Sequence, residues 1–295
     1  MSRLNRYQIM DLYRQEIVDK LKSLNKSVLT TADIHSILST NQHDWKLPAS
    51  TTSEELLEFL VRRRKVLRQV AITVSGRAVI RYLFTDGKLD PMEFALSIFP
   101  KLYLSHYSAV AYHDLTNEII KSIYVNKEQS EKSKVGVSQM MLQSNIDYAF
   151  SKSMRQTSNY FDFEGRRIYM LNSRFTEQLG VMEKNAIRVT DLERTLIDIS
   201  VRPEYAGGVY EVLNVFRMAR GRVSANKLRM YLQKLNYIYP YHQVIGFYLE
   251  RAGFNETALK IMETIPIQYD FYLTYNISDK AFSERWRLHY PRNLS

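Results

Sequence analysis

The most constraining feature of the sequence is a stretch from Val61 to Arg81 that carries seven basic residues and no acidic one. Two β-prone runs, Val66 to Val74 and Ala78 to Phe84, flank Ser75-Gly76-Arg77. Glycine tolerates the backbone conformation that a tight hairpin needs, so this pattern predicts two antiparallel strands. Positive charge therefore gathers where a helix would end and a hairpin would begin.

Three helices are predicted before this hairpin. Apolar residues recur at helical spacing from about Arg6 to Leu24, and Thr31 can cap a short helix that runs through Ser39. A third helix would be capped by Thr52 or Ser53 and end in the basic residues Arg62 to Lys65. Three helices followed by a hairpin predict a winged helix-turn-helix.

The distribution of charge points to DNA as a partner. The formal net charge is +10, and residues 1 to 89 hold 15 Lys and Arg against 9 Asp and Glu, a net of +6. In a winged helix, one helix enters the major groove while the wing contacts phosphate or the minor groove. The predicted DNA contacts are Arg62, Arg63, Arg64, Lys65, Arg68 and Arg77.

Two other interpretations of the basic stretch stay open. Cations also suit the C-terminus of a solvated helix, and a winged helix can serve as a protein-interaction adaptor that does not touch DNA. About twelve residues, Thr40 to Thr51, separate the second and third predicted helices, where a helix-turn-helix usually has about three or four. Trp45 and Lys46 in this insertion are further candidates for DNA contact.

Composition argues against several classes of enzyme. The chain has no Cys, and its 10 Gly form neither a GxGxxG nor a P-loop pattern. His106 and His113 lack a third ligand, and no spacing assembles a Ser-His-Asp triad. The sequence lacks a membrane-spanning apolar run. We therefore expect a cytoplasmic, non-enzymatic protein without metal or cofactor, with no membrane partner.

Beyond a turn-rich segment near residue 89, the pattern is mixed and increasingly helical, so we expect domains at 1–89 and 90–295. Helices are expected at 104–115, 138–150, 209–220, 224–235, 241–252 and 255–264; strands are expected at 119–126, at 269–275 and in a hairpin at 160–171 that turns at Glu164-Gly165. Thr190 and Glu193 predict a capping box. The expected fold class is α+β, a winged helix-turn-helix followed by a larger, helix-rich mixed α/β domain.

Three segments resemble the antitoxin component of AbiE-type abortive-infection systems. Residues 105–116 read SHYSAVAYHDLT, with Asp114 where that family usually has Gly. Residues 189–208 read VTDLERTLIDISVRPEYAGG, which is similar to the family's helix, turn and helix signature. The tail from Trp286 to Pro291 is similar to the family's closing "W...YP".

The resemblance implies a type IV antitoxin that also autorepresses its operon by binding inverted repeats in operator DNA. Its C-terminal domain would counteract a nucleotidyltransferase-like toxin encoded beside it, without a stable complex. Asp198, Arg202, Glu204 and Tyr205 are candidates for an exposed antitoxin surface, although helix termination and an internal ion pair explain the same residues. Tyr237, Tyr239 and Tyr241 suggest base stacking or the packing of a loop onto the core.

Overall fold

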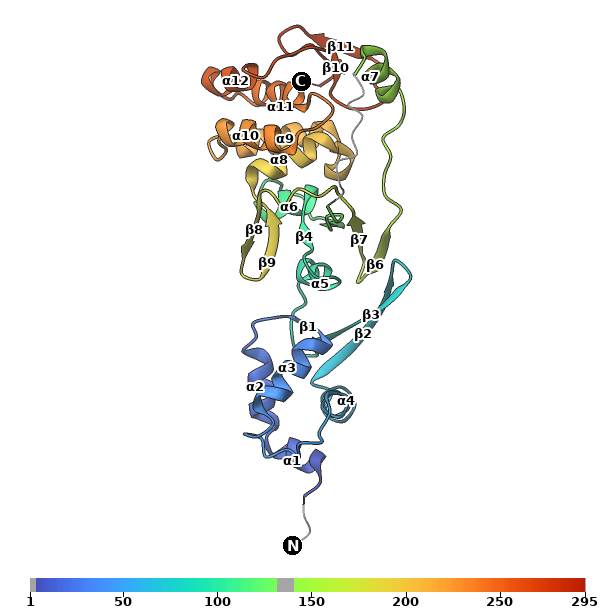
Figure 1. Cartoon of the computed structure of the whole chain (residues 1–295), viewed down its shortest axis with the longest axis vertical. Helices are drawn as coiled ribbons and strands as arrows, with labels where there is room; N and C mark the ends of the chain where they lie inside the picture. Colours follow the sequence, from blue (N-terminus) through green and yellow to red (C-terminus); the bar gives the residue numbers. More distant parts are fainter. Residues whose placement is uncertain (1–3, 132–140, 295) are drawn as a thin grey trace. The chain divides into compact units, whose positions relative to one another are not determined.

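The computed structural model describes residues 4–131 and 141–294 and shows a mixed α/β protein (Figure 1). The chain divides into two compact units, Met1–Pro100 and Lys101–Ser295. The boundary lies beyond residue 89 because α5 (Pro91–Ser97) belongs to the first unit. Arg81 donates hydrogen bonds to the carbonyls of Ser97 and Ile98, and the Glu93 carboxylate accepts from the amide of Ser27 at 2.7 Å.

The N-terminal unit begins with α1 (Arg6–Leu12) and α2 (Arg14–Lys22), where one continuous helix was expected. Tyr13 interrupts it, with φ −95° and ψ 14°. After β1 (Val28–Leu29), α3 (Thr31–Asn41) is capped by Thr30 and not, as expected, by Thr31, because the Thr30 hydroxyl accepts from the amide of Asp33. Helix α4 (Ser53–Leu57) is capped by Thr52, which forms a capping box with Glu55. A π-helical turn, η1 (Glu58–Arg63), continues α4 to its predicted basic end.

The predicted hairpin is confirmed as β2 (Leu67–Val74) and β3 (Arg77–Phe84), which pair antiparallel in a sheet of order β1-β3-β2. Ser75 and Gly76 at its tip have φ of 51° and 75°, the left-handed region that glycine tolerates.

Trp45 lies in the core of the N-terminal unit and is only 1% exposed. The expectation that it contacts DNA is therefore wrong. Its amide donates to the carbonyl of Asn41, so the chain turns after α3 and carries the indole inward with Leu47. Lys46, with φ 53°, remains exposed between these two buried residues.

The C-terminal unit contains a mixed sheet of order β6-β7-β5-β4-β9-β8. Its strands are β4 (Tyr103–Leu104), β5 (Ser122–Asn126), β6 (Tyr160–Phe163), β7 (Arg166–Leu171), β8 (Val181–Lys184) and β9 (Ile187–Thr190). The β6–β7 hairpin was predicted, whereas the helix expected from Leu104 is instead β4 followed by α6 (His106–Tyr112). Strands β5 and β7 run parallel, and both end at the same edge, at Asn126 and Leu171.

Helices α8 (Leu192–Val201), α9 (Val209–Ala219), α10 (Ala225–Leu235), α11 (Tyr241–Arg251) and α12 (Glu256–Glu263) form a helical layer (Figure 1). Helix α8 packs against α6, α9, α10 and α11, so it lies between the sheet side and the helical side of the unit. The predicted Thr190–Glu193 capping box is wrong. Asp191 caps α8 by accepting from the amide of Arg194, and Glu193 accepts from the amide of Ser224 at 2.9 Å.

The end of the chain forms a small sheet of β10 (Phe271–Tyr272), β12 (Leu288–Pro291) and β11 (Lys280–Ser283), in that order. The expected strand at 269–275 is thus reduced to β10. Helix α7 (Gln143–Phe150) lies within the helix expected at 138–150, whose first three residues fall outside the described part of the chain. No helix among the described residues is both long and apolar enough to span a bilayer.

Gly246 in α11 lies against the ring of Trp286, which is fully buried. A methyl group at this position would overlap the indole. Gly246→Ala should therefore destabilise the C-terminal unit by about 1–3 kcal/mol in urea unfolding, the usual cost of overpacking a core. Helix propensity alone predicts the opposite sign, a gain of roughly 0.5–1 kcal/mol. A measured gain would contradict the packing described here.

Candidate functional site

The basic residues predicted to contact DNA are all exposed on the N-terminal unit, but they do not share one role. Arg63 pairs with Glu58 at 3.0 Å and lies 3.7 Å from the centre of the Tyr7 ring. Arg64 forms an ion pair with Asp11 of α1. Both guanidinium groups therefore hold η1 against α1.

Three other predicted contacts leave their charge facing solvent. Across the described residues, no side-chain hydrogen bond or ion pair engages Arg62, Lys65 or Arg77. By contrast, the acidic groups of this region are used internally: Glu55 pairs with Arg6, and hydrogen bonds from Tyr7 and Arg63 lower the pKa of Glu58. Arg68 is also exposed on β2. Arg62 and Lys65 at the end of η1 and Arg77 at the hairpin tip thus form a positive surface with which no acidic side chain pairs among the described residues.

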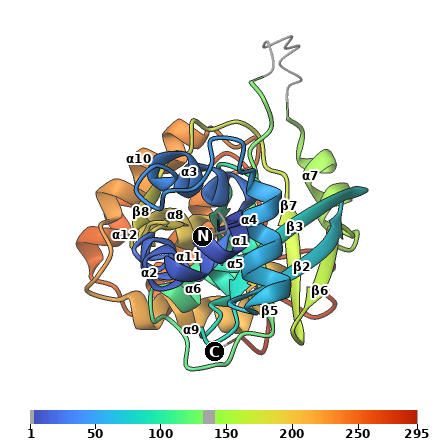
Figure 2. The same cartoon turned by 90° about the horizontal axis from the view of Figure 1, so that it is seen from below.

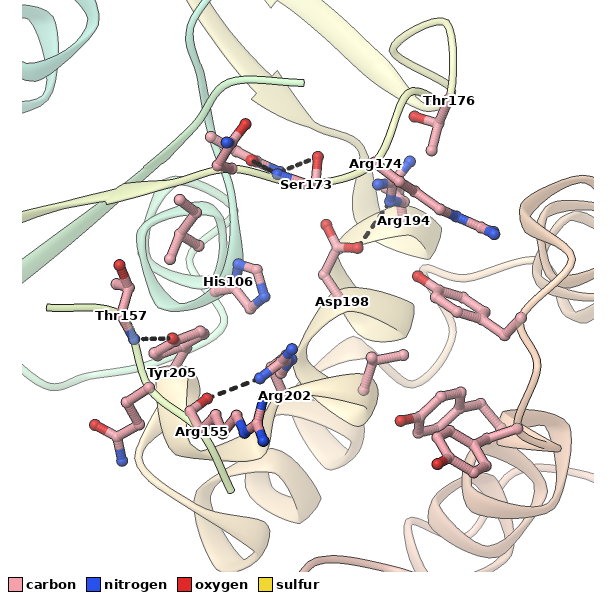
Figure 3. A pocket seen from close by; sticks show the side chains of 18 of the residues that line it. His106, Arg155, Thr157, Ser173, Arg174, Thr176, Arg194, Asp198, Arg202 and Tyr205 are labelled. Atoms are coloured by element: carbon pink, nitrogen blue, oxygen red, sulfur yellow. Dashed lines mark hydrogen bonds and ion pairs between the residues drawn. The ribbon is translucent and has the colours of Figure 1, made fainter. Parts of the chain in front are cut away.

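The C-terminal unit contains a cavity of about 810 Å³ (Figure 3). It opens at the edge where the parallel strands β5 and β7 end, and Asn126 and Leu171 line it. Ligands of α/β sheets commonly bind beyond the carboxyl ends of parallel strands. Helix α8, the 3₁₀ turn η2 (Pro203–Ala206), the start of α11 and loops at 155–159, 172–176 and 237–240 supply the other walls.

A buried ion pair forms the floor of the cavity. Arg194 Nε lies 2.8 Å from Asp198 Oδ1, one turn further along α8, and Arg194 also donates to the carbonyl of Leu179 at 2.7 Å. Burial alone would lower the pKa of Arg194, but the Asp198 carboxylate, together with Tyr237 and Tyr103, outweighs burial and raises that pKa. The other carboxylate oxygen, Asp198 Oδ2, is buried and has no partner among the described residues.

His106 faces the same opening from the start of α6 (Figure 3). Its backbone is left-handed, with φ 50°, which is unusual for a residue other than glycine, and its Nδ1 lies 2.9 Å from Ser105 Oγ. Burial lowers the pKa of His106 to about 4, so the ring is neutral at pH 7. The ring packs edge-on against Tyr205, 5.4 Å between centres.

Arginine and tyrosine side chains form the rim of the cavity. Arg202 donates to the backbone carbonyl of Arg155 at 2.8 Å, and Arg174 lies 5.2 Å from the centre of the Tyr237 ring. Among the described residues that line the cavity are four arginines and one acidic residue, Asp198. The arrangement can therefore bind an anion beside an aromatic group.

The prediction that Asp198 and Tyr205 belong to an exposed surface is wrong, because both side chains are buried. Asp198 and Tyr205 are 6% and 7% exposed and so are not surface residues. Asp198 pairs with Arg194, while the Tyr205 hydroxyl accepts from the amide of Thr157 at 2.7 Å. Arg202 is half-buried and lines the cavity, whereas Glu204 is exposed and does not.

Sequence reasoning missed Arg155 and Arg174 because each lies in a loop without a motif, and only the fold brings them near α8. From the sequence, His106 and His113 were a weak metal pair and more simply two partly buried histidines, so neither was given a role at a site. His113 instead lies with its Nε2 2.6 Å from the carbonyl of Thr190. The described residues contain no group of three or more His, Cys, Asp or Glu side chains placed to hold a metal. Tyr237 and Tyr239 pack against the core and also line the cavity.

No family model matches the chain, and no curated protein matches it in sequence. Fold and site define an α/β protein of two units, one with a basic surface and one with an arginine-lined cavity. A similar solved structure is that of the RV2827C protein from Mycobacterium tuberculosis, with a TM-score of 0.57 and 12% sequence identity. The likeness covers 98% of this chain and 93% of that chain, and at this identity it concerns the fold alone.

The buried neutral state of His106 predicts a loss of stability in acid. In the unfolded chain His106 has the ordinary histidine pKa of 6.5. Between pH 6.5 and about 4 the unfolded state therefore binds a proton at His106, whereas the folded state does not. Stability is full above pH 6.5 and falls through this window. In His106→Asn, the difference in unfolding free energy between pH 7.5 and pH 5.0 should shrink by about 2 kcal/mol.

Unfolding of the C-terminal unit can be followed through Trp286 fluorescence in a Trp45→Phe background, since the chain has 2 Trp. His43, whose ring is fully exposed in the N-terminal unit, provides a matched His43→Asn control that should leave this difference unchanged. An equal pH dependence in His106→Asn and in its parent would contradict a buried neutral imidazole.

Proposed function

We propose that this chain is the antitoxin of a type IV toxin–antitoxin, abortive-infection system and that it also represses its own operon. In this proposal the N-terminal unit is a winged helix that binds inverted repeats in double-stranded operator DNA. The C-terminal unit counteracts a nucleotidyltransferase-like toxin without forming a stable complex. The protein acts in the cytoplasm and has no catalytic role.

The observation that supports DNA binding is a group of exposed cations without an ion-pair partner among the described residues, Arg62 and Lys65 at the end of η1 and Arg77 at the hairpin tip. The element order α1/α2, β1, α3, α4/η1, β2, β3 supports the winged-helix assignment, because a helix followed by a wing can engage groove and backbone together. Arg62 and Lys65 extend from the helix end, and Arg77 from the hairpin tip.

The charge on α4 and η1 suggests how this surface meets DNA. The first turn of α4 carries the exposed Glu54, so a phosphate near that end would be repelled. The basic end of η1 and the hairpin tip are the groups suited to phosphate contact. We infer that Arg62, Lys65 and Arg77 anchor the unit on the DNA backbone, while Arg63 and Arg64 keep η1 in place.

The antitoxin half of the proposal rests on the resemblance of residues 105–116, 189–208 and 286–291 to the AbiE-type antitoxins. All three segments lie in the C-terminal unit, and the second includes α8 and η2. This separation supports a division of labour in which neutralisation does not need the basic surface. The alternative function is a protein-interaction adaptor that does not bind DNA.

Replacing Arg62 and Arg77 together by Ala should weaken binding to the DNA upstream of the operon at least about tenfold, with folding unchanged. The plot of log affinity against log salt should lose about 2 from its slope, close to one per phosphate contact. Gel-shift titrations between 50 and about 200 mM salt give both quantities.

The matched control is Lys20→Ala with Lys88→Ala, which removes the same charge from exposed positions of the same unit. It should keep the wild-type slope. If both double variants bind alike, or if the wild type shows no salt dependence, the adaptor function is the better account.

The Arg62→Ala/Arg77→Ala chain should still rescue growth from the toxin when it is expressed from an unrelated promoter. The C-terminal unit is unchanged in this variant, so neutralisation should persist while repression is lost. The readout is colony formation at matched protein levels, together with reporter output from the native promoter. Loss of rescue along with loss of repression would refute the division of labour.

A further inference from the structure

We propose that the cavity at the edge of the β5–β7 sheet binds a free nucleoside diphosphate or triphosphate. This site lies wholly in the C-terminal unit and does not depend on the proposed DNA-binding function. Its charge, its aromatic wall and its unsatisfied carboxylate oxygen each fit a different part of such a ligand.

The positive charge fits the phosphates. Asp198 neutralises Arg194, which leaves Arg155, Arg174 and Arg202 without a carboxylate partner among the described residues of the cavity wall. Arg202 uses one guanidinium nitrogen on the carbonyl of Arg155, and Arg174 uses one on the carbonyl of Asn236, at 3.3 Å. Guanidinium groups bind phosphate oxygens in bidentate fashion, and several of them favour a ligand with more than one negative charge.

The aromatic wall fits a base. Tyr237 and Tyr239 precede α11, Tyr241 begins it, and Tyr275 closes the same side of the cavity. These side chains are in contact with one another, with Tyr237 and Tyr241 5.3 Å apart between ring centres. Stacking of a base on tyrosine contributes about 1–3 kcal/mol to binding. A bare phosphate would leave this wall unused.

The buried carboxylate fits a sugar or base donor. Asp198 is 6% exposed, and its Oδ2 has no hydrogen-bond donor among the described residues. A buried acceptor without a hydrogen bond lowers the stability of the fold by about 1–3 kcal/mol, and by more when the acceptor is charged. A ribose hydroxyl or an exocyclic amino group would satisfy it. Asp198, His106 and Arg202 surround the same opening in Figure 3.

The size of the cavity also favours a nucleotide over a simple anion as the ligand. Sites for small organic ligands span about 300–1,000 Å³, and this cavity measures about 810 Å³. It therefore has room for a base, a sugar and a phosphate chain together. Burial keeps His106 neutral, so the ring can accept or donate a hydrogen bond without adding charge.

Isothermal titration of the full-length protein in 150 mM salt tests the proposal, with ATP, GTP, CTP and UTP as separate ligands. At least one should bind with a dissociation constant below about 1 mM, while adenosine and inorganic tripolyphosphate bind at least about tenfold more weakly. Arg155→Gln should weaken nucleotide binding at least about tenfold. Its fold should be intact, because the contact of Arg155 with Arg202 uses only the backbone carbonyl.

The matched control is Lys260→Gln, an exposed position of α12 away from the cavity wall, which should bind as the wild type does. The Arg62→Ala/Arg77→Ala chain should also bind nucleotide normally, so failure of the DNA-binding proposal would not affect this result. Tripolyphosphate binding as tight as ATP, or equal binding by Arg155→Gln and Lys260→Gln, would overturn the nucleotide site. So would binding of a short single-stranded RNA through Arg155 in the absence of any free-nucleotide binding.

Discussion

The buried ion pair of Arg194 and Asp198 links the stability of the C-terminal unit to the chemistry of its cavity. Their side chains are only 3% and 7% exposed, and they lie one turn apart on the helix that separates the sheet from the helical layer. Removing one partner of such a pair usually costs about 3–5 kcal/mol, since the other charge is left buried. The pair satisfies Arg194 but leaves Asp198 Oδ2 unpartnered. Asp198 therefore has two roles: one carboxylate oxygen stabilises Arg194, and the other is free to accept a hydrogen bond from a ligand.

In the N-terminal unit, ion pairs lie between helices and are partly exposed. Its acidic residues Glu55 and Asp11 pair with cations across α1, α4 and the end of η1, and Glu58 accepts a hydrogen bond from Tyr7 of α1. Arg62 and Arg77 are left facing solvent at the helix end and the hairpin tip. The same basic run thus contains arginines that stabilise the fold and arginines that are available to a partner. Composition alone does not show which arginine has which role.

Local signals predicted much of the fold. The cap expected at Thr52 or Ser53 and the turns at Gly76 and Gly165 depend on neighbouring residues, so the sequence predicts them. Burial explains two errors, because Trp45 turns inward and Asp198 and Tyr205 are not on the surface. The internal ion pair left open for Asp198 is confirmed by its contact with Arg194, whereas the cap of α8 was placed one residue too early, at Thr190 instead of Asp191. The cavity could not be predicted, because Arg155, Arg174 and Arg202 come from separate segments without a shared pattern.

We propose that the basic run of the N-terminal unit binds DNA and that the cavity of the C-terminal unit takes no part in this binding. Hydrogen–deuterium exchange of the full-length protein with and without its upstream DNA tests this claim most directly. Slower exchange on DNA binding should be confined to peptides from η1 through the β2–β3 hairpin, at residues 58–84. Protection restricted to peptides that line the cavity, with 58–84 unchanged, would contradict the account.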